Sequence, residues 1–249
     1  MLRFLSLCVL ASCGRFGFAE REDPPIDAAT ADMAPVDAGM PSPIHRYPFD
    51  GNLDDKVGGT SLVALMAGTF ELAGYRFPMN GGLVLDSTAL PAAVYTIDMI
   101  LAVDQISSWR KLIDFDGGGL DRGLYVYEGA LEHVLIPNPG AGDFVTSAVV
   151  FAPSVTFRLT LTRDATNRAV AYINKAPVAA VRTTTEAVPV NPTGTFAFDD
   201  PARTTQINAA TVRFFVDDSA TVGNEAAPGI VRQITIWDVP LTEAQVAAL

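Results

Sequence analysis

The chain has 249 residues, 49% hydrophobic and 18% charged, which is enough to bury a sizeable core in one large domain. Its formal net charge of −11 would repel the phosphates of nucleic acids and of anionic lipid headgroups, so we expect no nucleic-acid binding. The chain has only two cysteines, Cys8 and Cys13, and two histidines, His45 and His133. A zinc site built from several such ligands is therefore nearly excluded.

Residues 1–12 have the features of a signal peptide. Arg3 supplies the positive charge, and the apolar run over 4–10 is shorter than the roughly 20 apolar residues that span a bilayer. Residues 20–43 are dominated by Pro, Ala and Asp and contain no aromatic residue. Such a segment cannot bury enough surface to offset its ordering entropy. We therefore predict a disordered linker over 13–43 and a single domain over 44–249.

The signal peptide ends in a quartet, Leu10-Ala11-Ser12-Cys13, that resembles a bacterial lipobox. The resemblance implies that Cys13 is lipidated and becomes the N-terminus of an exported lipoprotein. Gly14 rather than Asp follows the cysteine, which favours the outer membrane or the cell surface. The alternative is cleavage after Ala19, which follows Gly17 and Phe18 and would release a secreted protein.

From His45 onward, short runs alternate between apolar and polar residues, and Gly, Pro, Asn and Asp separate them. In one run Phe157, Leu159 and Leu161 alternate with Arg158, Thr160 and Thr162, which predicts a half-buried strand. The same reasoning predicts strands over 95–103, 111–115, 124–127, 168–173, 212–216 and 231–237.

One helix signal stands at the C-terminus. Thr242 precedes Gln245 by three residues, which is the spacing of a capping box, and an apolar run over 246–249 follows. Many short strands with one terminal helix predict an all-β sandwich or barrel.

Three segments together resemble the concanavalin A-like lectin/glucanase superfamily, in its laminin G-like (LamG) branch of exported bacterial proteins. They are YPFDGNLDD at 47–55, FRLTLTRD at 157–164 with AYIN at 171–174, and ITIWDVPLTEAQV at 234–246. Lys175 stands where that branch usually has glycine. The resemblance implies a two-sheet antiparallel jelly roll that serves as a binding or adhesion module, often for glycans and sometimes with a structural calcium ion.

No catalytic pair is evident. Glucanases of this superfamily carry Glu-x-Asp-x-Glu on one strand, so that carboxylates face one sugar, and this chain lacks that series. Asp114 and Asp116 have the spacing of two, but Gly117 to Gly119 follow them. We therefore predict a protein without catalytic residues, and we assign no role to His133.

Calcium prefers six to eight oxygen ligands, and two acidic segments are rich in them. The first holds Asp50, Asn52, Asp54 and Asp55, and the second holds Asp217, Asp218, Asn224 and Glu225. Because the first and last strands pair in the resembling folds, Asp238 is expected near Asp50. The alternative is that all of these are turn residues, whose side chains bond their own backbone.

Glycan binding predicts exposed aromatic rings with polar neighbours. Trp109, Tyr125 and Tyr127 are the candidates, and the two tyrosines share one face if their segment is a strand. The alternative is that this face packs into the core, as we expect for Trp237.

These observations predict a non-catalytic, surface-displayed module that binds glycans or protein partners of the cell envelope and touches the membrane only through its lipid anchor. An envelope polysaccharide hydrolase or lyase and a purely structural envelope component are the alternatives. The oligomeric state is left open.

Overall fold

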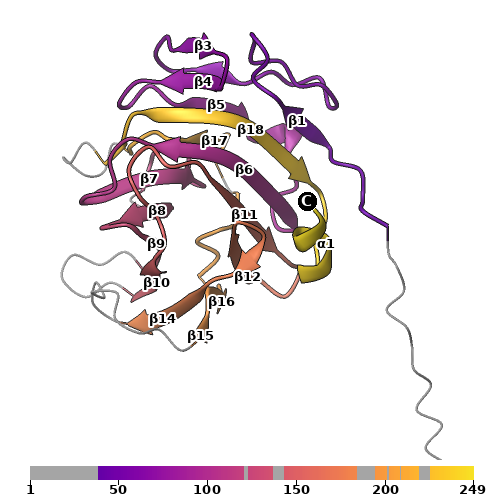
Figure 1. Cartoon of the computed structure of the whole chain (residues 1–249). Coiled ribbons are helices and arrows are strands. Elements are labelled where there is room, and N and C mark those ends of the chain that lie inside the picture. Colours follow the sequence, from indigo (N-terminus) through magenta and orange to yellow (C-terminus); the bar gives the residue numbers. More distant parts are fainter. Residues whose placement is uncertain are drawn as a thin grey trace, which may run out of the picture. The chain divides into compact units, whose positions relative to one another are not determined.

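The computed structural model describes residues 39–249 apart from 121–122, 137–142, 184–193, 201, 208 and 219–224. The signal peptide, Cys13, Ala19, Asn224 and all but the last residues of the predicted linker lie outside the described residues. Within the described residues, two antiparallel sheets pack into a sandwich with one short C-terminal α-helix (Figure 1). The predicted fold class is confirmed.

Sheet A, as far as the structure describes it, has nine strands. In sheet order they are β13 (Ala176–Pro177), β12 (Arg168–Ile173), β11 (Phe157–Arg163), β6 (Tyr95–Val103), β18 (Gly229–Trp237), β4 (Gly74–Phe77) and β3 (Thr69–Glu71), with β1 (His45–Tyr47) also on β18 and β16 (Ala197–Asp199) also on β12.

Sheet B also has nine strands among the described residues. Their order is β15 (Gly194–Thr195), β14 (Ala179–Thr183), β10 (Asp143–Val149), β9 (Ala130–Ile136), β8 (Leu124–Tyr127), β7 (Trp109–Asp114), β17 (Thr211–Phe214), β5 (Leu83–Asp86) and β2 (Val63–Ala64). A short 3-10 helix, η1 (Ser87–Ala89), follows β5.

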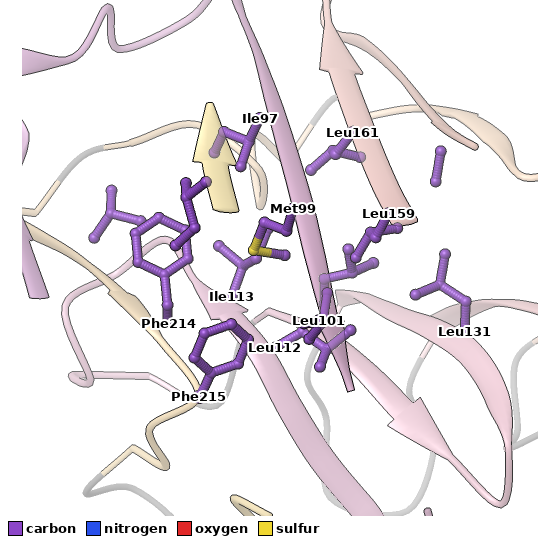
Figure 2. Close-up of a cluster of buried hydrophobic side chains, with 14 of the residues drawn as sticks. Ile97, Met99, Leu101, Leu112, Ile113, Leu131, Leu159, Leu161, Phe214 and Phe215 are labelled. Carbon is purple, nitrogen blue, oxygen red and sulfur yellow. The ribbon is translucent and has the colours of Figure 1, made fainter. Parts of the chain in front are cut away.

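The core lies between the two sheets, where the alternation of the sequence places it. Figure 2 shows Ile97, Met99 and Leu101 of β6 and Leu159 and Leu161 of β11 facing side chains of sheet B. Those partners include Leu112, Ile113, Leu131 and Phe214. Apolar burial of this kind contributes roughly 25 cal/mol per Å².

The predicted bounds of β6, β8 and β12 match the structure. Strand β7 begins two residues earlier than predicted, at Trp109, and β17 ends at Phe214 because Phe215 adopts a φ of 61°. The turn after β12 has φ of 50° at Asn174 and 71° at Lys175. A two-residue hairpin turn of this kind needs positive φ at both positions, which explains why glycine is usual at the second.

The polar face of β11 is buried as well, so the expectation of a half-buried strand was wrong for this face. Thr160 and Thr162 are almost fully covered, and the C-terminal segment lies against this side of sheet A. There Trp237, Leu241 and Val246 form a second, smaller apolar cluster with Tyr172.

The C-terminal helix α1 (Glu243–Ala248) begins as the sequence predicts. The Thr242 side chain accepts a hydrogen bond from the Gln245 N–H, and the Gln245 side chain accepts one from the Thr242 N–H. This reciprocal pair satisfies two N–H groups that the first helical turn leaves without partners. Trp237 is buried, as predicted, and its indole N–H donates to the Pro41 carbonyl at 3.0 Å. Within the described residues, no helix is long and apolar enough to cross a membrane.

Candidate functional site

The acidic loop after β1 is organised by Asp55, whose side chain is fully buried. Its Oδ1 accepts from the N–H groups of Arg46 and Val57, and its Oδ2 accepts from the Gly58 N–H and from His45 Nδ1 at 2.6 Å. Burial works to raise the pKa of Asp55, but these hydrogen bonds outweigh it and hold the pKa below its usual value. Asp55 therefore fixes the path of the loop.

The other acidic residues of this loop do not converge on Asp55. Asp50 is exposed and pairs with Lys56 Nζ at 3.3 Å. Asn52 accepts from the Asp54 N–H, and Asp54 accepts from the Ser61 hydroxyl at 3.1 Å. The contact of Asn52 with the Asp54 N–H is the side chain to backbone contact of a turn, and the other two join side chains.

The first and last strands pair, as predicted, with His45 opposite Ile236 and Tyr47 opposite Ile234. In this antiparallel register Asp238 follows the His45 end of the pair, whereas Asp50 follows the Tyr47 end. The register of this strand pair therefore does not itself place Asp238 beside Asp50.

The second acidic segment does converge. Single carboxylate oxygens of Asp217, Asp218 and Glu225 lie within 4.8 Å of one another. Asp217 Oδ2 accepts from the Glu225 N–H at 2.8 Å, which ties the two ends of the loop together. Lys111 reaches this cluster from β7, and its Nζ donates to Asp218 Oδ2.

In both groups some of the carboxylate oxygens already have partners. The four hydrogen bonds to Asp55 use the lone-pair positions that a metal would need, and Lys111 already contacts the Asp218 carboxylate. Calcium at the predicted positions would have to displace these contacts, and it stays a prediction.

Three aromatic rings gather on the outer face of sheet B, the face that points away from the core. Trp109 of β7 lies opposite Tyr127 of β8, and their ring centroids are 4.6 Å apart at a tilt of 35°. The Phe144 ring of β10 lies 6.0 Å from Trp109. All three side chains are half-buried. We call Trp109, Tyr127 and Phe144 the aromatic platform.

Tyr125 lies next to this platform on the same face of sheet B. It shares a face with Tyr127, as predicted, but it is fully buried and contacts Trp109 edge-on at 5.1 Å. Leu124 and Val126 belong to the inter-sheet core and Tyr125 does not. The predicted face of β8 is therefore the outer face, and Tyr125 supports the platform without being exposed itself.

The turns next to the platform have unusual backbone geometry. Glu128 and Gly129 form a two-residue hairpin between β8 and β9, with φ of 47° and 82°. A non-glycine residue rarely adopts such a φ, which costs free energy. Here the Glu128 carboxylate compensates by accepting a hydrogen bond from the Ser108 N–H at 2.6 Å. This contact fixes the ends of β7 and β8 and places a carboxylate beside Trp109.

The sequence did not single out Phe144 or Lys111 as site residues. Phe144 lies in a strand that the alternation did not reveal. Lys111 stands two residues after Trp109 and therefore on the same face of β7, opposite Tyr125. Recognising that β7 begins at Trp109 would have placed Lys111 beside the tyrosines.

Asp114 and Asp116 do not form a catalytic pair. Asp114 is fully buried, and its Oδ1 accepts from the N–H groups of Asp116 and Gly118. Burial raises the pKa of Asp114 despite the charge of Lys111 nearby. The carboxylate thus shapes the glycine turn after β7.

His133 is fully buried in the core and stacks on Phe198. Its Nδ1 donates to the Gly123 carbonyl at 2.7 Å, and its Nε2 lies 2.9 Å from the Thr204 hydroxyl. Burial lowers the pKa of His133 to about 4, so the ring is neutral near pH 7.

No protein-family model matches the chain, and no curated protein sequence does. Solved structures do share the fold. A Trypanosoma rangeli sialidase in complex with 2,3-difluorosialic acid matches with a TM-score of 0.57 and 12% identity, over 84% of this chain and 33% of that one.

Two botulinum neurotoxin structures match in the same way. The type G receptor-binding domain has a TM-score of 0.53 and 11% identity, over 84% of this chain and 50% of its own. A type C structure, whose cell entry depends on interaction with two ganglioside molecules, has a TM-score of 0.57 and 11% identity, over 83% and 50%. The chain thus spans a third to a half of the structures it matches, and at such identities the likeness shows the fold alone.

Proposed function

We propose that this domain is a glycan-binding module and that the aromatic platform is its binding surface. The observation that carries the proposal is the partly exposed pair of Trp109 and Tyr127 rings on the outer face of sheet B. Flat aromatic rings bind the apolar faces of sugars, and nearby polar groups bind the hydroxyls. Glu128 borders the platform beside Trp109 and supplies such a group.

The platform is held in place before any ligand arrives. Tyr125 packs edge-on against Trp109, and the hydrogen bond from Ser108 to Glu128 fixes the strand ends. Preorganisation of this kind reduces the entropy lost on binding. The sialidase structure holds a sialic acid derivative and the type C toxin interacts with gangliosides, so their shared fold is compatible with the proposal.

We further propose that the module has no catalytic role and is displayed at the cell surface through a lipid on Cys13. The proposal is supported by the lipobox and the Pro-rich linker in the sequence. Asp114 and Asp116 have the sequence spacing of the glucanase carboxylates. Asp114 is buried and accepts hydrogen bonds from backbone N–H groups, which supports a binding role over hydrolysis.

A glycan array followed by titration of each hit tests the proposal. We expect Trp109→Ala to weaken binding at least tenfold, which corresponds to about 1.4 kcal/mol. Phe70→Ala is the matched control, because Phe70 is 42% exposed on β3 of the other sheet. Equal affinities of the two variants would exclude the platform as the glycan-binding surface. A wild-type chain that binds no glycan would favour a structural or protein-binding role.

A second readout uses tryptophan fluorescence. The chain has two tryptophans, so Trp237→Phe leaves Trp109 as the single fluorophore. A sugar that stacks on the platform should change the emission of this variant, after a thermal melt has shown that it is folded. Unchanged emission at a glycan concentration that saturates binding would place the site elsewhere.

A further inference from the structure

Lys111 is a buried lysine on the outer face of sheet B. Only 1% of the residue is exposed and none of its side chain is. A buried ammonium group is costly unless opposite charges and hydrogen bonds compensate for the lost hydration. The contacts of Lys111 therefore show which groups compensate for burying its charge.

Those contacts are mostly acidic. Nζ donates to Asp218 Oδ2 and lies 3.8 Å from Asp114 Oδ2. The backbone N–H of Lys111 donates to the Glu225 carbonyl at 2.6 Å, so main chain and side chain both hold the loop between β17 and β18. Lys111 thus joins β7 to both ends of the acidic loop.

The carboxylates of the acidic loop between β17 and β18 need a positive charge close by. Carboxylate oxygens of Asp217, Asp218 and Glu225 within 4.8 Å of one another would repel if no positive charge lay among them. Proteins meet this demand with a divalent ion or with a basic side chain. Here Nζ already contacts one carboxylate of the cluster, and the side chains of both Lys111 and Asp218 are fully buried.

The same ammonium group contacts the support of the aromatic platform. Nζ lies 5.0 Å from the centroid of the Tyr125 ring, a distance at which the ring attracts a cation. Tyr125 in turn packs edge-on against Trp109. One buried charge therefore connects the acidic loop with Tyr125, the neighbour of the platform.

We propose that the Lys111 ammonium is the built-in cation of the Asp217–Asp218–Glu225 cluster and takes the position that a divalent metal ion would otherwise hold. The contacts of Lys111 with the loop and with Tyr125 then form without metal. This inference concerns how the loop is held, so it stands independently of the proposed glycan binding.

The first test is a thermal melt of the full chain with excess calcium and with a chelator. We expect the two melting temperatures to agree, because Lys111 blocks the cluster. A melting temperature that rises with calcium, and whose rise is lost in Asp218→Asn, would overturn the proposal in favour of a metal site.

The second test is Lys111→Met, which keeps much of the apolar length of the side chain and removes the charge. Without calcium we expect the melting temperature to fall by roughly 10 °C, because a buried carboxylate loses its partner. Excess calcium should recover part of this fall by entering the vacated position. Two outcomes would overturn the proposal that lysine takes the place of a metal ion. In one, the melting temperature of the variant falls and calcium does not raise it; in the other, the variant has the melting temperature of the wild type.

Lys56→Met is the matched control. Lys56 is exposed and pairs with Asp50 at 3.3 Å in the acidic loop after β1, so its removal should change neither the melting temperature nor the calcium response. If Lys111→Met does not fold in chelator, the readout becomes the refolding yield with and without calcium. Folded protein only with calcium supports the proposal, and none in either condition overturns it.

Discussion

Arg158 of β11 and Asp98 of β6 form a bidentate ion pair on the outer face of sheet A. Arg158 Nε donates to Asp98 Oδ1 and Nη2 donates to Oδ2, both at 2.8 Å. The Thr160 hydroxyl also donates to Oδ1, and Arg158 Nη1 donates to the carbonyl of Leu249. This pair connects two strands of the sheet with the last residue of the described chain, and it holds a fully buried carboxylate.

Asp98→Ala should therefore destabilise the domain by about 3 kcal/mol, because it leaves a largely buried guanidinium group without its carboxylate. The measurement is urea unfolding followed by circular dichroism. Arg168→Ala serves as the control, since Arg168 and Asp199 form an exposed pair at 3.6 Å and should leave the urea midpoint unchanged. Equal midpoints for the two variants would mean that the buried pair contributes no net stability.

The acidic loop after β1 offers a second comparison, between two neighbouring carboxylates. Asp55→Ala should cost about 3 kcal/mol, because it leaves three backbone N–H groups and a buried histidine without their acceptor. Asp50→Ala should leave the urea midpoint unchanged, since the contact of Asp50 in the described part of the chain is an exposed ion pair. If the Asp50 variant were the less stable one in calcium but not in chelator, the calcium prediction for this loop would be supported.

His133 makes stability depend on pH. Its pKa is lowered from 6.5 to about 4, so the unfolded chain binds the proton more readily than the folded one. The stabilisation is complete above pH 6.5 and is lost as the pH falls toward 4, up to a limit of about 3 kcal/mol at 1.36 kcal/mol per unit.

The free energy of unfolding, measured by urea titration from pH 7.5 to 4, should fall more steeply for the wild type than for His133→Gln. The difference between the two curves isolates His133, because the carboxylates titrate alike in both proteins. Parallel curves would show that the buried ring contributes nothing to the pH dependence.

Lipidation at Cys13 can be tested directly in a bacterial host. The full chain should incorporate labelled fatty acid and sediment with membranes, whereas Cys13→Ser should do neither, because only a thiol accepts the lipid. Mass spectrometry of the N-terminus distinguishes the alternative. A mature chain that begins at Glu20 would show cleavage after Ala19 and release of a secreted protein.

The sequence by itself determined the features that depend on local pattern. Alternation along 95–103 and 157–161 placed Ile97, Met99, Leu101, Leu159 and Leu161 in the core, because successive residues of a strand point to opposite faces. The capping box at Thr242 and the turn at Asn174 are equally local, since all their hydrogen bonds and dihedral angles lie within a few residues. The shared face of Tyr125 and Tyr127 followed from the same alternation.

Only the tertiary structure decided which side chains meet across the sandwich. Lys111 and Asp218 are 107 residues apart in sequence, and Arg158 and Asp98 are 60 apart. Phe144 joins the aromatic platform because sheet B brings β10 near β7, an order of strands that no local pattern encodes.

The acidic loop after β1 shows the physical reason most plainly. Asp50 and Asp55 are alike in sequence, yet one is exposed and the other is buried under four hydrogen bonds. Composition predicts that oxygens are dense there, but the path of the loop determines whether an oxygen faces an N–H group, a lysine or water. The sequence thus determined the sandwich, and long-range contacts decided which of its charges are buried and what compensates them.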